Sequence, residues 1–409
     1  MKHKAAPKKN VLFVWRHNND FDSTLPVIFT AAKNNSFDHI YIFVSSEELL
    51  WRNDFRISVL SELPNITIFD IWKLAGKLIG IPMRRLCETT RMTRGPLRKI
   101  FPRIARTIIS RSAWRNQLLI TIREIDPALI AFDWVDLSWD RPDQGPWGIK
   151  SIADWAKSNR RPVVGLMHGL SLASFPNGAN SLSHDFSRLY IESEFRYKQM
   201  AEADFPQEKI CVAGAPRFDK SWVDLLGKAI ATQSLARHDH QIKTIVFFAT
   251  KLVYDYDFER VIDWLDRVAT VPGIRLIVQP HPRGQGKSSF RRLRRHPGCI
   301  IDMTTPAPIL IREADIVSTL VSSVVCEAIV LGLPLLYPRF LNSLSTRFDE
   351  EGACIVVERM EDTEAAIRRC LEEKIPWEAY KRFLDRHVLG GQQSPITATL
   401  NDMLLIVGQ

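Results

Sequence analysis

The sequence predicts an α/β protein with two parallel-sheet domains, because short apolar runs alternate with helical segments along most of the chain. The chain has 409 residues, 45% of them hydrophobic and 25% charged. That length is sufficient for two hydrophobic cores, and the composition is ordinary for a globular protein. Many of the apolar runs end in polar residues, which is typical of strands whose carboxyl ends line a ligand crevice. We expect the first domain at residues 1–225, with a basic insertion at 79–119, and the second at 240–390.

The first domain is expected to begin with a βα unit, since an apolar run is followed by a polar loop and a helix from about residue 24. The loop lacks a GxGxxG motif, so the sequence does not predict a dinucleotide-binding fingerprint. The apolar runs that predict strands in this domain are 10–15, 39–44, 65–69, 128–132, 162–167, 189–191 and 208–212.

The second domain is expected after a turn-rich passage, GAPRFD at 214–219, and a boundary near 220–242. Helices are predicted at 258–271 and 363–373, again alternating with apolar runs. The predicted strands are 244–249, 276–278, 299–302, 316–317, 335–338 and 353–357.

Two strand ends of the second domain carry a pattern that favours phosphate binding. The run at 276–278 leads into Gln279 and His281, and the run at 316–317 ends at Thr319. Ser322 and Ser323 are then expected to open a helix, whose free N–H groups and positive dipole end would attract an anion. An imidazole nearby can donate a hydrogen bond or a proton to the same phosphate. The predicted nucleotide-binding residues are Thr250, Lys251, His281, Pro282, Arg283, Thr319, Ser322, Ser323 and Glu327.

Three strand ends of the first domain supply candidate acids and bases. Asp133 follows the strand at 128–132, His168 follows the next strand, and Glu192 follows the third. His168 could also simply anchor the following glycine. The predicted catalytic residues are His168, Asp133 and His281, and the predicted acceptor or interdomain contacts are Asp20, Asp136, Glu192 and Arg217.

The pairs His281-Pro282 and Ser322-Ser323, with Glu327 after them, resemble the HP and SS motifs of bacterial transferases with cytidine-nucleotide donors. These families include sialyl-, polysialyl- and Kdo transferases and the teichoic-acid glycerophosphotransferases. The resemblance implies two Rossmann-like domains facing a cleft, the GT-B architecture, with residues 391–409 packing back toward the first domain. It also implies transfer of a CMP-activated ulosonic acid, such as Kdo or a sialic acid, to a glycan or lipid-linked acceptor of a surface polysaccharide.

A nucleotide-activated substrate, CMP- or CDP-linked, is therefore expected, and an obligatory metal is not. The alternatives within the same fold are a CDP-glycerol glycerophosphotransferase, a UDP-sugar-dependent transferase and a nucleotide-sugar 2-epimerase. A basic nucleic-acid-binding protein is the non-enzyme alternative. It is disfavoured because no nucleic-acid module is recognisable and stacking aromatics do not accompany the cationic residues.

The net charge of +9 arises in one stretch, residues 84–115. Ten cations lie there against the single anion Glu88, so the remainder of the chain is balanced. Dense cations with interleaved aliphatic residues predict a surface that docks on anionic lipid headgroups, although a solvated basic helix would have the same composition. We expect a cytoplasmic protein, peripheral on the inner face of the membrane, with a patch formed by Arg98, Lys99, Arg103, Arg106 and Arg111.

Overall fold

The computed structural model describes most of the chain outside the basic stretch and a few loops. The side chains of residues 18–20, 114–115 and 230–231 lie outside that description. The described residues are 9–16, 18–45, 57, 59–60, 62–74, 76, 82, 85, 114–134, 137, 148–167, 169–170, 172, 185–231, 242–250, 257–281 and 287–408.

The first half of the described chain forms a seven-stranded parallel sheet in the order β3-β2-β1-β4-β5-β6-β7. Because β1 lies inside the sheet, between β2 and β4, the chain builds outward to β3, returns to β4 and continues to β7. Every residue of β1 and β4 is buried, so both read as continuous apolar runs, as expected of strands covered on both faces. The strands are β1 Asn10–Trp15, β2 His39–Val44, β3 Ile66–Asp70, β4 Leu129–Asp133, β5 Val163–Leu166, β6 Arg188–Ile191 and β7 Ile210–Val212.

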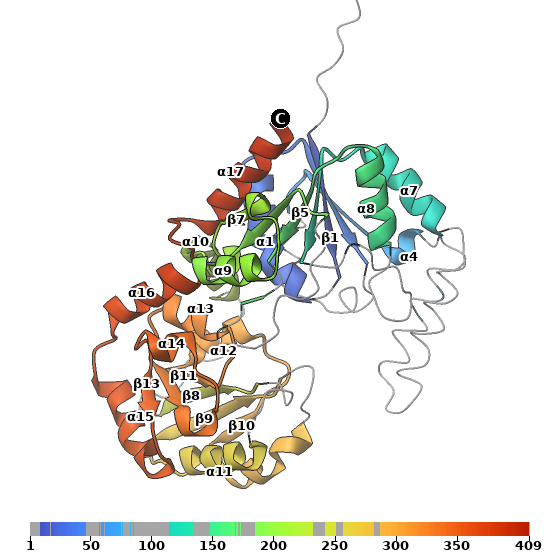
Figure 1. The fold of residues 1–409 in the computed structure, drawn as a ribbon. Helices are drawn as coiled ribbons and strands as arrows, with labels where there is room; N and C mark the ends of the chain where they lie inside the picture. The colour runs from blue at the N-terminus through green and yellow to red at the C-terminus, as the bar shows by residue number, and fades with distance from the viewer. Residues whose placement is uncertain are drawn as a thin grey trace, which may run out of the picture.

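Helices cover both faces of this sheet, which gives it two hydrophobic cores. Helix α1 packs over one face, and α7 and α8 pack over the other (Figure 1). Helix α1 begins at Asn18, earlier than the expected residue 24, because only two residues separate it from β1. The helices of this half are α1 Asn18–Lys33, α4 Ile71–Leu74, α7 Trp114–Ile125, α8 Ile149–Ser158, α9 Glu194–Glu202, η1 Gln207–Lys209, η2 Pro216–Phe218 and α10 Lys220–Ala231.

The second half forms a six-stranded parallel sheet in the order β10-β9-β8-β11-β12-β13. Its topology matches that of the first six strands of the first sheet. The chain runs from β8 outward to β10, then crosses to β11 on the other side of β8 and continues to β13. The strands are β8 Lys243–Phe248, β9 Ile274–Gln279, β10 Cys299–Ile301, β11 Ile316–Thr319, β12 Leu335–Pro338 and β13 Ile355–Val357. The predicted fold class, two parallel Rossmann-like α/β domains, is confirmed.

The helices of the second half also lie on both faces of their sheet. The arginine-rich segment around residue 291 is a kinked 3-10 segment, with Phe290 at the kink. The helical segments are α11 Phe258–Ala269, η3 Lys287–Arg295, α12 Ala307–Glu313, α13 Val325–Val330, η4 Arg339–Leu341, α14 Arg347–Glu350, η5 Met360–Asp362, α15 Thr363–Glu372, α16 Trp377–His387 and α17 Pro395–Gly408.

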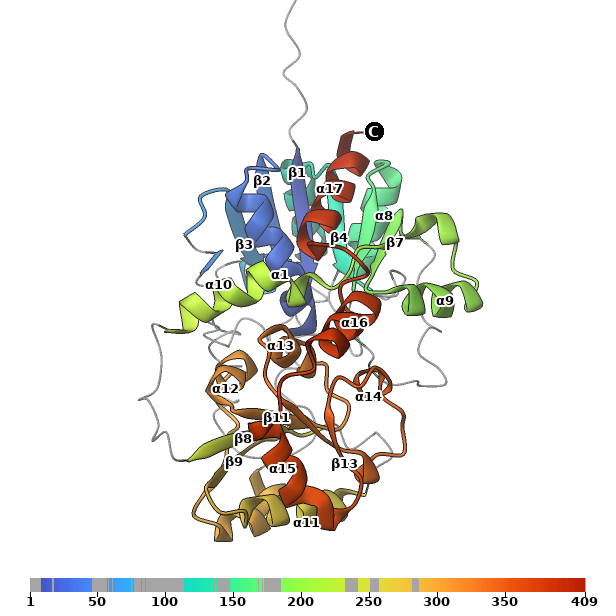
Figure 2. The same cartoon turned by 90° about the vertical axis from the view of Figure 1, so that its left-hand side faces the viewer.

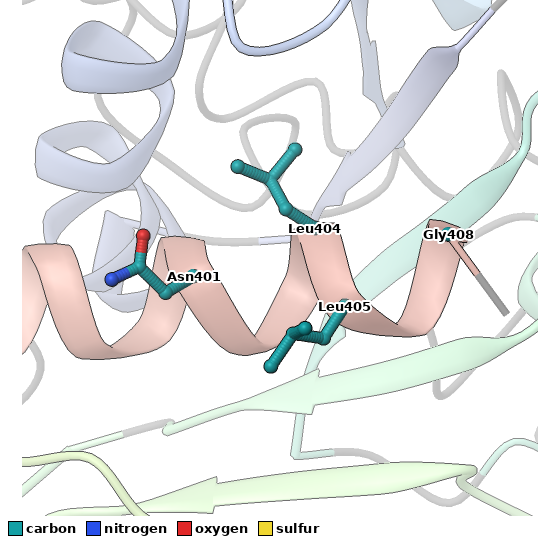
Figure 3. Close-up of a pocket in the computed structure, with 4 residues that line it drawn as sticks. All are labelled: Asn401, Leu404, Leu405 and Gly408. Carbon is teal, nitrogen blue, oxygen red and sulfur yellow. The ribbon is translucent and has the colours of Figure 1, made fainter.

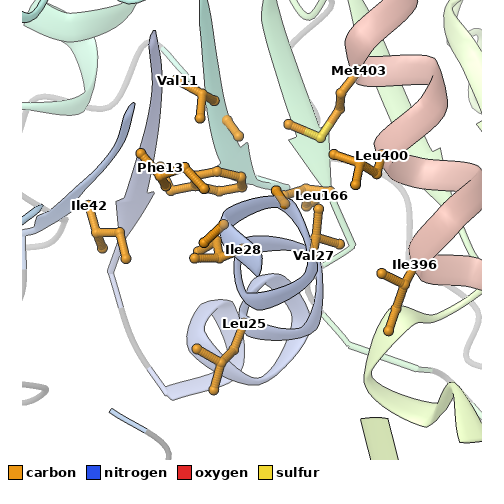
Figure 4. Packing of buried hydrophobic residues seen from close by; sticks show 14 of the residues in the cluster. Val11, Phe13, Leu25, Val27, Ile28, Ile42, Leu166, Ile396, Leu400 and Met403 are labelled. Carbon is orange, nitrogen blue, oxygen red and sulfur yellow. The ribbon is translucent and has the colours of Figure 1, made fainter. Parts of the chain in front are cut away.

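The end of the chain crosses from the second sheet to the first, through α16 and then α17 (Figures 1 and 2). Ile396, Leu400 and Met403 of α17 pack into the core beneath α1 (Figure 4). Asp402 accepts hydrogen bonds from the Tyr190 hydroxyl at 2.9 Å and from Arg188 at 3.1 Å, which ties α17 to β6. In the part of the chain that is described, no helix is long and apolar enough to span a membrane.

The two chain crossings between the halves pack backbone against backbone. The Ala215 amide donates to the Val388 carbonyl at 2.8 Å. Gly214 has a φ of +81°, and a Cβ at this position would lie 2.4 Å from the Leu389 carbonyl oxygen. A glycine is therefore required here, both for the left-handed backbone and for the close approach of the second crossing.

Candidate functional site

The carboxyl ends of β8, β9 and β11 lie side by side, as the phosphate-site prediction requires. Phe248 is paired with Gln279 on one side and with Thr319 on the other. Thr250 and His281 follow the first two of these strands, so the register brings Thr250, His281 and Thr319 to one edge of the sheet. The Thr319 hydroxyl donates to the Phe248 carbonyl at 2.7 Å and is fully buried, so this side chain fixes the strand ends to each other.

Ser322 and Ser323 lie in the turn before α13 and do not open the helix. The helix begins at Val325, with Val324 as a cap that offers no side-chain hydrogen bond. The Ser322 hydroxyl accepts from the Val324 amide at 3.4 Å, a long hydrogen bond that a ligand could replace. Both serines are partly exposed, so their hydroxyls are accessible to a ligand.

Glu327 is nearly fully buried on α13 and carries a cationic partner. Arg312 of α12 donates to its Oε1 at 2.7 Å, and also to the carbonyls of Pro308 and Val223. A buried carboxylate needs such a partner, because transfer from water without one is costly. Arg217, on the segment between the halves, pairs with Asp22 of α1 at 3.2 Å and lies within electrostatic reach of Glu327.

Asp133, at the end of β4, is fully buried and forms an ion pair with Arg16, which follows β1. The two strands are neighbours in the sheet, so their ends bring the opposite charges together. An arginine in contact favours the ionised carboxylate. To act as a base, Asp133 would have to accept a proton while its ion pair with Arg16 weakens. Its catalytic role stays a prediction.

Glu192, at the end of β6, is a second buried carboxylate, and only one of its two oxygens has a hydrogen-bond partner among the described residues. Arg196 donates to its Oε1 at 3.2 Å, whereas its Oε2 is buried and makes no hydrogen bond in the described part of the chain. Burial raises the pKa of Glu192, and Arg196 opposes that shift. Trp134 lies beside this pair, with the Arg196 guanidinium 5.5 Å from its ring, and packs against cores of both halves.

Several predicted residues lie outside the described residues, so their predictions stand as made. His168 and Asp136 are in this group, and of Asp20 only the backbone, within α1, is described. The nucleotide candidates Lys251, Pro282 and Arg283 and the patch residues Arg98, Lys99, Arg103, Arg106 and Arg111 also lie outside.

Sequence reasoning missed the cations that hold the carboxylates. Arg16 follows a predicted strand directly, so the strand-end rule applied to Asp133 would have found it. Arg312 gave no such signal, because it lies on a helix before its strand and reaches Glu327 only through the fold.

A hollow of about 510 Å³ lies beside α17, lined by Asn401, Leu404, Leu405 and Gly408 (Figure 3). The residues predicted for the site do not line it. We therefore place the candidate site at the carboxyl ends of β8, β9 and β11 and not in this hollow.

Solved structures resemble this chain over nearly its whole length, whereas no protein-family model and no curated protein matches it. The UDP-GlcNAc 2-epimerase of Neisseria meningitidis, bound to UDP-GlcNAc, is 14% identical with a TM-score of 0.62, covering 97% of this chain and 100% of that one. The Methanocaldococcus jannaschii UDP-GlcNAc 2-epimerase, in complex with UDP-GlcNAc and UDP, is 13% identical with a TM-score of 0.57, covering 97% and 99%. Anabaena HepE, in complex with UDP and glucose, is 13% identical with a TM-score of 0.51, covering 96% and 100%.

The class that the fold defines is therefore a two-domain α/β protein of the GT-B type. The prediction of a CMP-ulosonic acid transferase, with its Kdo and sialic-acid donors, is wrong, because these matching structures are those of UDP-GlcNAc 2-epimerases and of a protein holding UDP and glucose. The error has a physical reason. The HP and SS motifs were assigned to the phosphate end of a nucleotide, and phosphate contacts do not distinguish cytidine from uridine.

Proposed function

We propose that this chain is an enzyme of nucleotide-sugar metabolism that holds a UDP-linked sugar between its two sheets. This proposal is supported by polar side chains at the strand ends of a GT-B-type fold, where a phosphate could bind. The ends of β8, β9 and β11 bring Thr250, His281 and Thr319 together, and the serine turn follows the end of β11. In parallel sheets this edge is where ligands bind.

The reaction we propose is inversion at C2 of a UDP-N-acetylhexosamine, the activity of a nucleotide-sugar 2-epimerase. The observation that carries this proposal is the full-length likeness to solved structures of UDP-GlcNAc 2-epimerases, with TM-scores of 0.57 to 0.62. Inversion requires a base that removes the C2 hydrogen, and the electron pair left at C2 forms a C1=C2 double bond as the C1–O bond breaks and UDP leaves. An acid then adds a proton to the opposite face of C2, while UDP re-forms its bond to C1.

In this proposal the second half, residues 240–390, binds the nucleotide, and the first half, 1–225, faces the sugar. His281, Ser322 and Ser323 would stabilise the charge of the diphosphate. His168 and Asp133 would be the proton-transfer candidates, and Arg16 would hold the Asp133 carboxylate in position. No metal is assigned to the site.

The test is incubation with UDP-GlcNAc in D₂O, followed by proton NMR. The expected result is a second anomeric signal from the C2 epimer, with deuterium at C2 in the product. Absence of both the epimer and deuterium exchange would contradict the proposal.

Glycosyl transfer from a UDP-sugar is the second candidate, because HepE is described in complex with UDP and glucose. A second incubation, with UDP-glucose in the presence and absence of a sugar acceptor, separates the two reactions. UDP-glucose that releases UDP only when a sugar acceptor is added would indicate transfer, whereas an epimerase needs no acceptor. A cytoplasmic location, with contact to the inner membrane face, remains part of the proposal and rests on the basic stretch alone.

A further inference from the structure

A series of four charged side chains, arranged as two ion pairs, lies where the two halves of the molecule meet. Asp22 of α1 pairs with Arg217 of η2 at 3.2 Å, and Arg312 of α12 pairs with Glu327 of α13 at 2.7 Å. Arg312 also donates to the Val223 carbonyl of α10, which returns the series to the first half. All four side chains are partly or largely buried, with Glu327 only 5% exposed.

Arg217 lies on the segment that packs between the helices of the two ion pairs. Its segment, η2, packs against both α1 and α13. Burial lowers the pKa of Arg217, and the nearby charge of Glu327 raises it. The Arg217 guanidinium therefore interacts electrostatically with two carboxylates, Asp22 from the first half and Glu327 from the second.

Glu327 is the residue through which this series reaches the nucleotide site. To accept hydrogen bonds from ribose hydroxyls, its carboxylate must keep one orientation. Arg312 holds one oxygen, Oε1. A second cation near the same carboxylate reduces the cost of burying its charge and limits the orientations available to it.

We propose that Arg217 is a positioning residue of the nucleotide site. It stabilises the carboxylate of Glu327 from the first half of the chain, and Asp22 holds Arg217 in place. Helix α1 thereby contributes to the nucleotide affinity of the opposite half. The inference rests on the proposed function, because it takes Glu327 as a contact of the bound UDP-sugar.

The test is isothermal titration with UDP and with UDP-GlcNAc. Arg217→Met should weaken binding about tenfold, the scale of one hydrogen bond or ion pair to a charged group. Arg217→Lys should retain part of the affinity, because lysine keeps the charge but lacks the planar fork. Asp22→Asn should weaken binding about threefold, and the double variant Asp22→Asn/Arg217→Met no more than Arg217→Met alone, since the two act through one contact.

The matched control is Arg359→Met, which removes one cation from an exposed pair with Asp362 in the second half. It should bind UDP as the wild type does. In turnover of UDP-GlcNAc, Arg217→Met should raise KM and leave kcat nearly unchanged, because the lost contact is made equally in ground and transition states. A merely structural role would lower the melting temperature and leave the dissociation constant unchanged.

Two negative results are distinguishable. If the wild type binds UDP and folded Arg217→Met binds it equally well, the positioning role is wrong and the proposed function stands. If the wild type binds neither ligand, the proposed function fails. The interaction of Arg217 with Glu327 can then be tested without ligand, by a double-mutant cycle of Arg217→Met and Glu327→Gln in urea unfolding. Additive effects on the free energy of unfolding would overturn the interaction.

Discussion

At the residue scale, His281 is the most direct test of the phosphate site. It lies at the carboxyl end of β9, beside the ends of β8 and β11. His281→Ala should lower turnover of UDP-GlcNAc by about 100-fold, the magnitude expected for one charge-stabilising or acid group. The chain offers a control in its second His-Pro pair, because His296 binds Asp266 at 2.7 Å on the exposed η3 side. Comparable losses in His281→Ala and His296→Ala would contradict the assignment.

Glu192 predicts a pH dependence of stability. Burial raises its folded-state pKa above the ordinary value of 4.5, so the folded protein binds a proton that the unfolded chain has lost. Stability from this group is complete below pH 4.5 and declines as pH rises toward the folded-state pKa. Glu192→Gln should therefore be more stable than the wild type at pH 8, and this advantage should shrink toward pH 5. Urea unfolding across this range is the measurement. Glu378→Gln, at an exposed position, is the control, and an advantage independent of pH would refute the argument.

At the element scale, α17 belongs energetically to the first half although it ends the chain. Met403 is fully buried against the first sheet, and Leu405 on the opposite side is 65% exposed. Met403→Ala should reduce the free energy of unfolding by about 2–5 kcal/mol, through lost burial and the cavity that remains. Leu405→Ala should change it by less than about 0.5 kcal/mol. Urea denaturation followed by circular dichroism gives both values, and equal effects would mean that α17 does not dock as described.

The elements also show what the sequence could predict. Strands such as β1 and β4 were found because both faces are buried and the chain reads as unbroken apolar residues. The start of α13 was placed too early, because two serines resemble a cap whether or not the helix begins there. The ion pair of Arg312 with Glu327 could not be found, since these residues are fifteen positions apart and meet only when α12 packs beside α13.

At the scale of the whole molecule, the two parallel sheets followed from the alternation of apolar runs and helical segments, whereas the strand-end site stays a prediction. The kind of nucleotide could not be predicted, because the HP and SS motifs describe how a phosphate is held and not which base accompanies it. Distinguishing uridine from cytidine requires the contacts to the base edge, and no pattern of a few residues in this chain encodes them.

The basic stretch at residues 84–115 makes the last prediction, which concerns where the whole molecule works. Its ten cations carry the net charge of an otherwise balanced chain. Each cation near an anionic lipid surface contributes about 1 kcal/mol, so several together suffice for reversible docking. The wild type should co-sediment with anionic liposomes at low salt, and less at high salt, because screening shortens the attraction to roughly 8 Å at physiological ionic strength.

The variant for this test combines Arg98→Glu, Arg103→Glu and Arg106→Glu. It should lose co-sedimentation and retain turnover of soluble UDP-GlcNAc, because these residues are not among the predicted nucleotide-binding or catalytic residues. Neutral liposomes are the control for insertion driven by apolar residues alone. If the wild type does not sediment with anionic liposomes at low salt, the stretch does not dock on membranes, and the peripheral location is wrong while the proposed reaction is unaffected.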